Sequence, residues 1–169
     1  MLAGDAPWQV VSLGACTATQ LAPLSVVVLR DFSYAPWHLK QARQALTAWV
    51  AKGGRLVLLH EAGIMLSPVF KEIAVPGEPL AAGKVGEISW QWQASDQPAK
   101  IAAPAVGAWT LQPGKQGRIC VRDAQDHILA IAGKHGQGEV IFWGFKAAGA
   151  DQPATALWHR LLKAWAPAD

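Results

Sequence analysis

The residues best placed to do chemistry lie in two short polar clusters, each directly after an apolar run. Arg30 and Asp31 follow one run, and His60 and Glu61 follow another. A carboxylate and an imidazole that lie close together can act as acid and base or can hold a metal ion. The same residues also fit an ordinary role, in which Asp31 caps a helix and His60 bonds a loop. Asp31, His60 and Glu61 are therefore the catalytic candidates, and no metal site is predicted.

The other histidines, the cysteines and a glycine-rich segment predict no further site. Metal-ligand spacing is missing among the remaining histidines, which are expected to be isolated: His38, His127, His135 and His159. Cys16 and Cys120 are too far apart for a CxxC site, and we expect both to be buried as small apolar residues. The segment 133–138 lacks a phosphate-loop pattern and predicts a hairpin turn. No cofactor is predicted.

Tryptophan is the compositional outlier, with nine residues in 169. Helical spacing predicts that one group is core: Trp37, Trp49, Trp158 and Trp165. A second group falls in the less regular middle of the chain and allows two interpretations, packing in the core or a platform for a sugar ring or a partner: Trp90, Trp92 and Trp109.

Composition excludes several classes of protein. Apolar residues make up 51% of the chain, which predicts a compact fold, and the 16% of charged residues is below the usual fraction, which suggests a buried face or a partner. The net charge is +3, and the basic residues are scattered, so we expect no nucleic-acid partner. No apolar run reaches the length of a membrane-spanning helix, so this segment is not expected to insert into a membrane.

Two apolar runs and a helix between them organise the first third of the chain. A short strand is predicted at 8–13, and the run 24–29 is typical of a parallel strand buried on both faces. Apolar positions in 36–52 recur every three or four residues, which predicts a helix that ends at Gly53 and Gly54. A strand at 55–59 then completes a right-handed βαβ unit.

The rest of the chain predicts one irregular region followed by antiparallel strands. Several prolines and glycines in 61–86 favour a long loop with at most a short helix near 67–73. Strict alternation predicts a strand at 87–93, and a turn at 123–126 separates the next two strands. The remaining predicted elements are strands at 117–123, 127–132 and 140–145 and an amphipathic helix at 153–165.

Several of these segments resemble the class I glutamine amidotransferase-like superfamily. The segments 25–32 and 48–60 are similar to its strand, helix and glycine-rich second strand, and 133–145 is similar to its closing hairpin. The resemblance implies an α/β fold, a three-layer sandwich of flavodoxin or amidotransferase-like type. Its mixed sheet would carry an antiparallel C-terminal hairpin.

The catalytic residues of that superfamily are not matched. Its nucleophilic cysteine sits on the sharp turn after the strand that follows the glycines, where this chain has His60. The C-terminal His-x-Glu pair is also missing, since Arg160 follows His159. We therefore expect a non-catalytic amidotransferase-like domain that serves in binding or assembly. Two alternatives remain: a sugar-related or metal-assisted enzyme similar to trehalose-utilisation-like proteins, and a carbohydrate-binding module built on the second tryptophan group.

The chain is predicted to be one domain over 1–169. Little sequence precedes Trp8 for the first strand and helix of the superfamily, so a piece of a longer protein is an alternative. The expected partner is a protein or the rest of such a parent chain, with a carbohydrate as the alternative. A cytoplasmic location is the default, and a periplasmic or membrane-attached one applies if the chain belongs to a larger protein.

Overall fold

The computed structural model describes residues 16–29, 36–91, 99–103 and 106–146. Two predicted elements, the strand at 8–13 and the helix at 153–165, lie outside these ranges. The helical elements are α1 (Ala18–Leu21), α2 (Pro36–Ala51), α3 (Glu61–Leu66) and the 3-10 turn η1 (Ser67–Val69). The strands are β1 (Val26–Leu29), β2 (Arg55–Leu59), β3 (Ala74–Leu80), β4 (Glu87–Trp90), β5 (Ala99–Ala102), β6 (Ala108–Pro113), β7 (Arg118–Asp123), β8 (Ile128–His135) and β9 (Gly138–Trp143). None of the described helices is long and apolar enough to cross a membrane.

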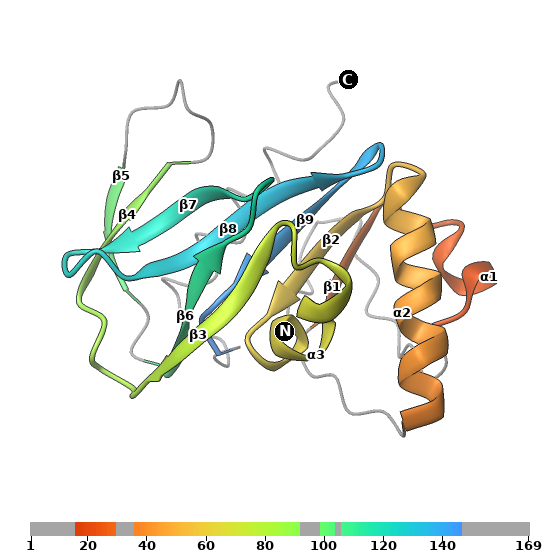
Figure 1. The fold of residues 1–169 in the computed structure, drawn as a ribbon. Coiled ribbons are helices and arrows are strands. Elements are labelled where there is room, and N and C mark those ends of the chain that lie inside the picture. The colour runs from red at the N-terminus through yellow and green to blue at the C-terminus, as the bar shows by residue number, and fades with distance from the viewer. Residues whose placement is uncertain (1–15, 30–35, 92–98, 104–105, 147–169) are drawn as a thin grey trace, which may run out of the picture.

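A mixed seven-stranded sheet forms the centre of the molecule, in the order β1-β2-β9-β8-β7-β4-β5 (Figure 1). Strands β1, β2 and β9 run parallel, with Val57 opposite both Val28 and Ile141. From β9 to β5 every neighbouring pair is antiparallel. The predicted βαβ unit and the predicted antiparallel arrangement of the later strands are therefore confirmed.

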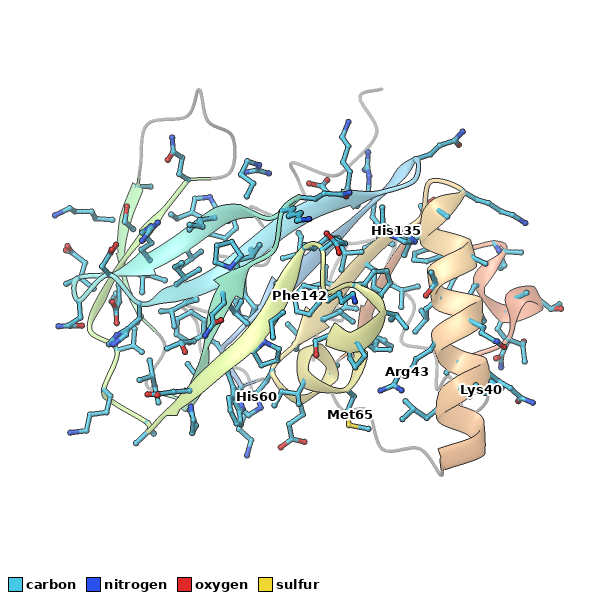
Figure 2. All side chains as sticks on the ribbon, in the orientation of Figure 1. Lys40, Arg43, His60, Met65, His135 and Phe142 are labelled. Carbon is cyan, nitrogen blue, oxygen red and sulfur yellow. The ribbon has the colours of Figure 1, made fainter. Side chains whose placement is uncertain are left out.

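Helix α2, helix α3 and a small antiparallel sheet of β3 and β6 cover one face of the large sheet (Figure 1). Helix α2 turns Ala42, Leu46 and Val50 toward this face, and all three are fully buried. Phe142 of β9 lies under α3 on this side (Figure 2), where a Cβ on Gly63 would be 3.3 Å from its ring. The spacing of four residues along α2 matches one helical face, as the sequence predicts.

The opposite face of the sheet carries a second hydrophobic cluster. Its members alternate with those of the first cluster along β2 and β9, so Val57 and Ile141 are fully buried on one side while Leu56 and Phe142 are fully buried on the other. Side chains of a strand alternate between faces, and both faces are apolar here because both are covered. The chain therefore has the α/β sandwich fold that the sequence predicts.

The glycines after α2 and those of the β8–β9 turn meet at one point. Gly53 has a φ of +113°, which ends the helix as predicted. Gly136 has a φ of +62° in the predicted hairpin turn, and the backbone N–H of Gln137 donates to the carbonyl of Ala51 over 3.0 Å. A Cβ on Gly138 would collide with the carbonyls of Val50 and Gly54. The segment 133–138 is therefore a hairpin that closes the end of α2, which confirms the prediction.

The region 61–86 is more ordered than predicted. Instead of a long loop, it holds α3, η1 and β3. Ala62 and Leu66 are both fully buried, so two apolar residues four apart suffice to seat α3 against the core. Strand β3 tolerates Pro76 and Pro79 because it belongs to a two-stranded sheet and is irregular between these prolines.

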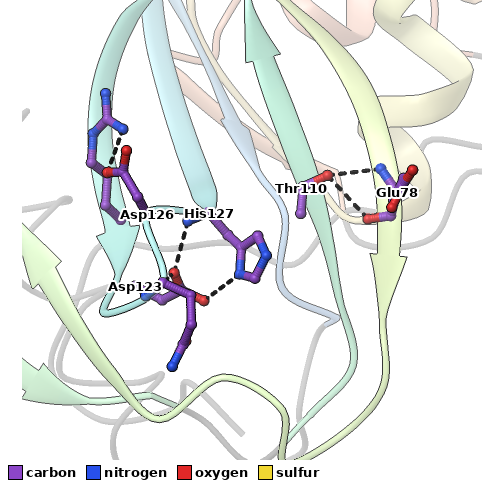
Figure 3. Close-up of polar contacts among 7 residues, drawn as sticks. Glu78, Thr110, Asp123, Asp126 and His127 are labelled. Atoms are coloured by element: carbon purple, nitrogen blue, oxygen red, sulfur yellow. Dashed lines mark hydrogen bonds and ion pairs between the residues drawn. The ribbon is translucent and has the colours of Figure 1, made fainter.

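The irregular part of β3 is filled by a threonine of the neighbouring strand. The Thr110 hydroxyl accepts a hydrogen bond from the backbone N–H of Glu78 over 2.7 Å and donates to the carbonyl of Glu78 over 3.2 Å (Figure 3). The side chain thus replaces ladder bonds at the irregularity.

Strand β1 also differs from its prediction. It pairs only with β2 among the described strands, and Val28 is 38% exposed. The run 24–29 is therefore the last strand of the sheet among the described residues, and its exposure at Val28 shows that it is not buried on both faces. A continuous apolar run does not distinguish these two positions in a sheet.

Candidate functional site

The chain makes a sharp turn at His60, directly between β2 and α3. His60 has φ 41° and ψ −106°, a conformation that a residue with a side chain rarely adopts. Its backbone N–H donates to the carbonyl of Trp143 over 2.7 Å, and its carbonyl accepts from the N–H of Gly63 over 3.0 Å. These bonds hold the strained residue between β9 and the first turn of α3. Such strain costs about 1–3 kcal/mol and persists only when the surroundings impose it.

A small cleft opens beside His60, at the carboxyl end of the parallel strands. It is lined by His60, Gly63, Trp109, Phe142, Trp143 and Gly144, among other apolar residues. The centroids of the His60 and Trp109 rings are 6.2 Å apart, and their planes are tilted by 58°. The cleft measures about 10 Å³, which is close to the space that one water molecule needs. The arrangement therefore presents one imidazole in an apolar setting and holds no more than a water.

Of the other two catalytic candidates, the structure describes only Glu61. Glu61 is exposed in the first turn of α3, where a carboxylate complements the helix dipole. Asp31 lies outside the described residues, so the convergence of all three side chains stays a prediction. Within the described ranges, no group of three or more histidine, cysteine or acidic residues is arranged to hold a metal ion.

The tryptophans of the second group have separate surroundings. Trp90 is 7% exposed, and its ring lies 5.9 Å from that of Trp143. Trp90 therefore packs in the core, as the first of the two interpretations has it, and does not form an exposed platform. Trp109 is half-buried beside His60, and Trp92 lies outside the described residues. Trp49 of the first group packs on the core, and its indole N–H donates to the carbonyl of Leu24 over 3.2 Å.

Both cysteines are buried as predicted, and neither is among the residues that line the cleft. Burial raises the pKa of the Cys16 thiol to about 11. Burial also raises the pKa of Cys120, although the nearby Arg118 guanidinium works against this rise. A raised pKa keeps a thiol protonated, and the protonated thiol is not the nucleophilic form. The two thiols are therefore small core groups.

Unlike the isolated histidine that the sequence predicts, His127 is paired with a carboxylate. The carboxylate of Asp123 lies 2.7 Å from the Nδ1 atom of His127 (Figure 3). Its other oxygen accepts from the backbone N–H groups of Gln125, over 3.0 Å, and of His127, over 2.8 Å. The Asp123 side chain is fully buried, whereas that of His127 is 42% exposed. The carboxylate thus closes the predicted turn at 123–126.

Sequence reasoning missed two features of the cleft as well as this pair. Trp143 ends β9 and Gly144 follows it, and their role appears only when β9 is known to lie beside β2. The one available signal is Gly144, where a Cβ would collide with the carbonyl of Trp109. For His127, the spacing of four residues from Asp123 is the signal, because the ends of a tight turn meet.

Comparisons with known proteins define the fold. No protein-family model and no curated protein matches the sequence. Among solved structures, the chain is similar to a protein from Bacteroides uniformis ATCC 8492 named as ThuA-like, with 14% identity, a TM-score of 0.69, and coverage of 92% of this chain and 74% of that one. It is also similar to cytoplasmic protein STM1381 from Salmonella typhimurium LT2, with 15% identity, a TM-score of 0.63, and coverage of 88% and 72%.

A third similar structure is a much longer enzyme. Gan42B, a GH42 β-galactosidase from G. stearothermophilus, matches with 14% identity and a TM-score of 0.56, over 85% of this chain. The match spans only 22% of the β-galactosidase chain. These likenesses show a fold shared with ThuA-like proteins, in agreement with the amidotransferase-like α/β fold that the resemblance implies.

Proposed function

We propose that the chain is a non-catalytic amidotransferase-like domain that serves in binding or assembly. One observation carries the proposal: His60 stands at the sharp turn where the resemblance implies a cysteine, and the cleft beside it measures about 10 Å³. A cleft of that size admits about one water molecule, and catalysis requires a substrate held against the reacting group. The raised pKa values of both thiols add support, because neither group is an activated nucleophile.

The solved structures support the assembly part of the proposal. The β-galactosidase that shares this fold carries it in about a fifth of its length, since the match spans 22% of that chain. A fold of this kind can therefore stand as one module beside others. We infer that the partner is a protein or the remainder of a parent chain.

The proposal is tested by the release of ammonia from glutamine. The purified chain is incubated with glutamine, and ammonia is compared with a sample that lacks protein. We expect no difference. Release of ammonia that disappears in Cys16→Ser or Cys120→Ser would overturn the proposal, since it would identify a nucleophilic thiol.

A second candidate function is favoured by the strained backbone of His60. Strained residues cluster at active sites, and His60 presents an imidazole at the strand end where open α/β sheets bind ligands. The candidate is an enzyme in which His60 acts as a general base, with Asp31 and Glu61 as the predicted partners. Its test is hydrolysis of a panel of nitrophenyl glycosides: activity lost in His60→Ala would support it, and the same background rate in both proteins would remove it.

A further inference from the structure

An open groove runs along α2, and none of its lining residues lines the cleft at His60. Its volume is about 520 Å³, and its lining comes from α2 and from η1. The lining residues include Lys40, Arg43, Gln44, Thr47, Ala48 and Val69. The α2 members recur at steps of three and four, so they form one continuous stripe of the helix. This stripe is distinct from the buried one of Ala42, Leu46 and Val50.

One side of the groove is held in place by an arginine. The Nε and Nη2 atoms of Arg43 donate to the carbonyl of Met65 over 3.1 and 2.5 Å. Figure 2 shows the Arg43 side chain reaching from α2 toward Met65 at the end of α3. The hydroxyl of Thr47 donates to the carbonyl of Arg43 over 2.6 Å and so stays close to its own helix. The polar side chains Arg43 and Thr47 of the groove are therefore fixed by hydrogen bonds, and small side chains form its floor.

The two charged residues that line the groove, Lys40 and Arg43, are both basic. Positions 32 to 60 of the sequence contain no Asp or Glu. Lys40 is exposed. No carboxylate is among the described residues that line the groove. The bonds of Arg43 to the Met65 carbonyl join it to a neutral acceptor, so they do not neutralise its positive charge.

We propose that this groove docks an acidic amphipathic helix of a protein partner. Apolar side chains of the incoming helix would pack over Ala48 and Val69, and carboxylates on its flank would meet Lys40 and Arg43. With 16 residues, α2 is about 24 Å long, so several turns of a partner can lie along it. The inference rests on the proposed binding role and names the kind of partner.

Two other occupants fit less well. Small-molecule sites enclose most of their ligand, whereas this groove is open along the helix. Nucleic-acid surfaces combine many cations with aromatic rings, and the described lining has two cations and no aromatic residue. A helix needs only a shallow trough with apolar contact and flanking charge.

The test uses two labelled helical peptides of the same length as α2. Both carry leucine along one face; the first has glutamate on its flanks and the second has lysine. Fluorescence polarisation with the whole chain is expected to show saturable binding of the glutamate peptide that weakens as salt rises. The lysine peptide is expected to bind at least about tenfold more weakly. Equal binding of both peptides, or of neither, would overturn the proposal.

Variants of exposed residues locate the binding surface. Ala48→Glu places a carboxylate on the groove floor and is expected to weaken the glutamate peptide at least about tenfold. Ala82→Glu, in the exposed turn after β3, is the matched control and is expected to bind normally. Lys40→Glu and its control Lys84→Glu are compared in the same way. Equal loss in groove and control variants would overturn the proposal.

The same samples separate this inference from the proposed function. Sedimentation equilibrium of the chain without peptide tests whether a second copy of the chain occupies the groove. A dimer that dissociates in Ala48→Glu would overturn the helical partner and identify the second copy as the occupant. Each preparation is also assayed for ammonia release. If the peptide does not bind and no ammonia is released, only the docking proposal is overturned. If ammonia is released in a way that depends on a cysteine, the proposed non-catalytic function is overturned.

Discussion

Two histidines of this fold sit in turns of opposite character. His60 joins a parallel strand to a helix and has a strained backbone, with no side-chain hydrogen bond to cap α3. His127 follows a tight hairpin turn, and its ring bonds to the buried carboxylate of Asp123 over 2.7 Å. The surroundings of His127 account for its position, because three hydrogen bonds meet on one carboxylate. At His60, by contrast, the bonds that fix the turn are made by the backbone, and the side chain does not cap α3.

The two turns differ in whether the backbone or a side chain holds their conformation. Backbone bonds to Trp143 and Gly63 fix the turn at His60, and these do not depend on the side chain at that position. The turn at His127 depends on one side chain, that of Asp123. We therefore expect substitutions in the hairpin turn to lower the stability of the protein through lost side-chain hydrogen bonds. Substitutions of His60 should change stability through the backbone strain of the strand–helix turn.

The largest expected effect follows removal of the Asp123 carboxylate. Asp123→Ala leaves two backbone N–H groups and the His127 ring without their acceptor. The free energy of unfolding should fall by about 3 kcal/mol, measured by urea denaturation. Asp126→Asn is the control, since it weakens only the exposed ion pair with Arg122 and should cost under about 1 kcal/mol. Equal losses in the two variants would contradict the turn-closing role of Asp123.

Truncation of His127 should have a smaller effect. His127→Ala removes one of the three hydrogen bonds of Asp123 and leaves both backbone donors in place. The free energy of unfolding should fall by about 1 kcal/mol in the same urea experiment. A loss as large as that of Asp123→Ala would mean that the imidazole, rather than the backbone bonds, holds the turn.

The strain at His60 is measured by two substitutions that both remove its ring. Glycine adopts a positive φ freely, whereas alanine keeps the strain, so His60→Gly should be more stable than His60→Ala by about 1 kcal/mol. Asp126 also has a positive φ, of 68°, and the pair Asp126→Gly and Asp126→Ala should give the same sign. Thermal unfolding compares all four proteins. If His60→Ala is at least as stable as His60→Gly, the turn is not strained.

The smallest effect concerns the thiols, which lie in neither turn. Burial raises the pKa of Cys16 to about 11, so its thiolate is scarce at pH 8 and alkylation by iodoacetamide should be slow in the folded protein. Since the folded pKa exceeds the ordinary thiol value of 9.0, the associated stability is present below pH 9 and is lost as the pH rises toward 11. Mass spectrometry should find both cysteines unmodified until denaturant is added. Rapid labelling of native protein would contradict their burial.

The regular elements could be predicted because their signals are local. Helix α2 carries its apolar residues at helical spacing and ends at glycines, and the hairpin of β8 and β9 shows its turn residues in the sequence. Strand β3 could not be predicted, since its prolines are tolerated only through the pairing with Thr110 and the rest of β6. The exposure of Val28 in β1 depends on the neighbours of this strand and not on its own residues.

The candidate site could be predicted only in part. The position of His60 after a buried strand marks a strand end, and the structure places it at the sharp turn. The cleft beside it is closed by Trp109 and Trp143, which come from distant parts of the chain. No local pattern reports how much space such residues leave.

A crystal structure of the His60 cleft, determined with and without soaked glutamine, would show whether the cleft can hold a substrate. We expect density for about one water molecule beside the imidazole, unchanged by glutamine. An open pocket in which Asp31, His60 and Glu61 converge on a bound ligand would contradict this expectation and would establish an enzyme site.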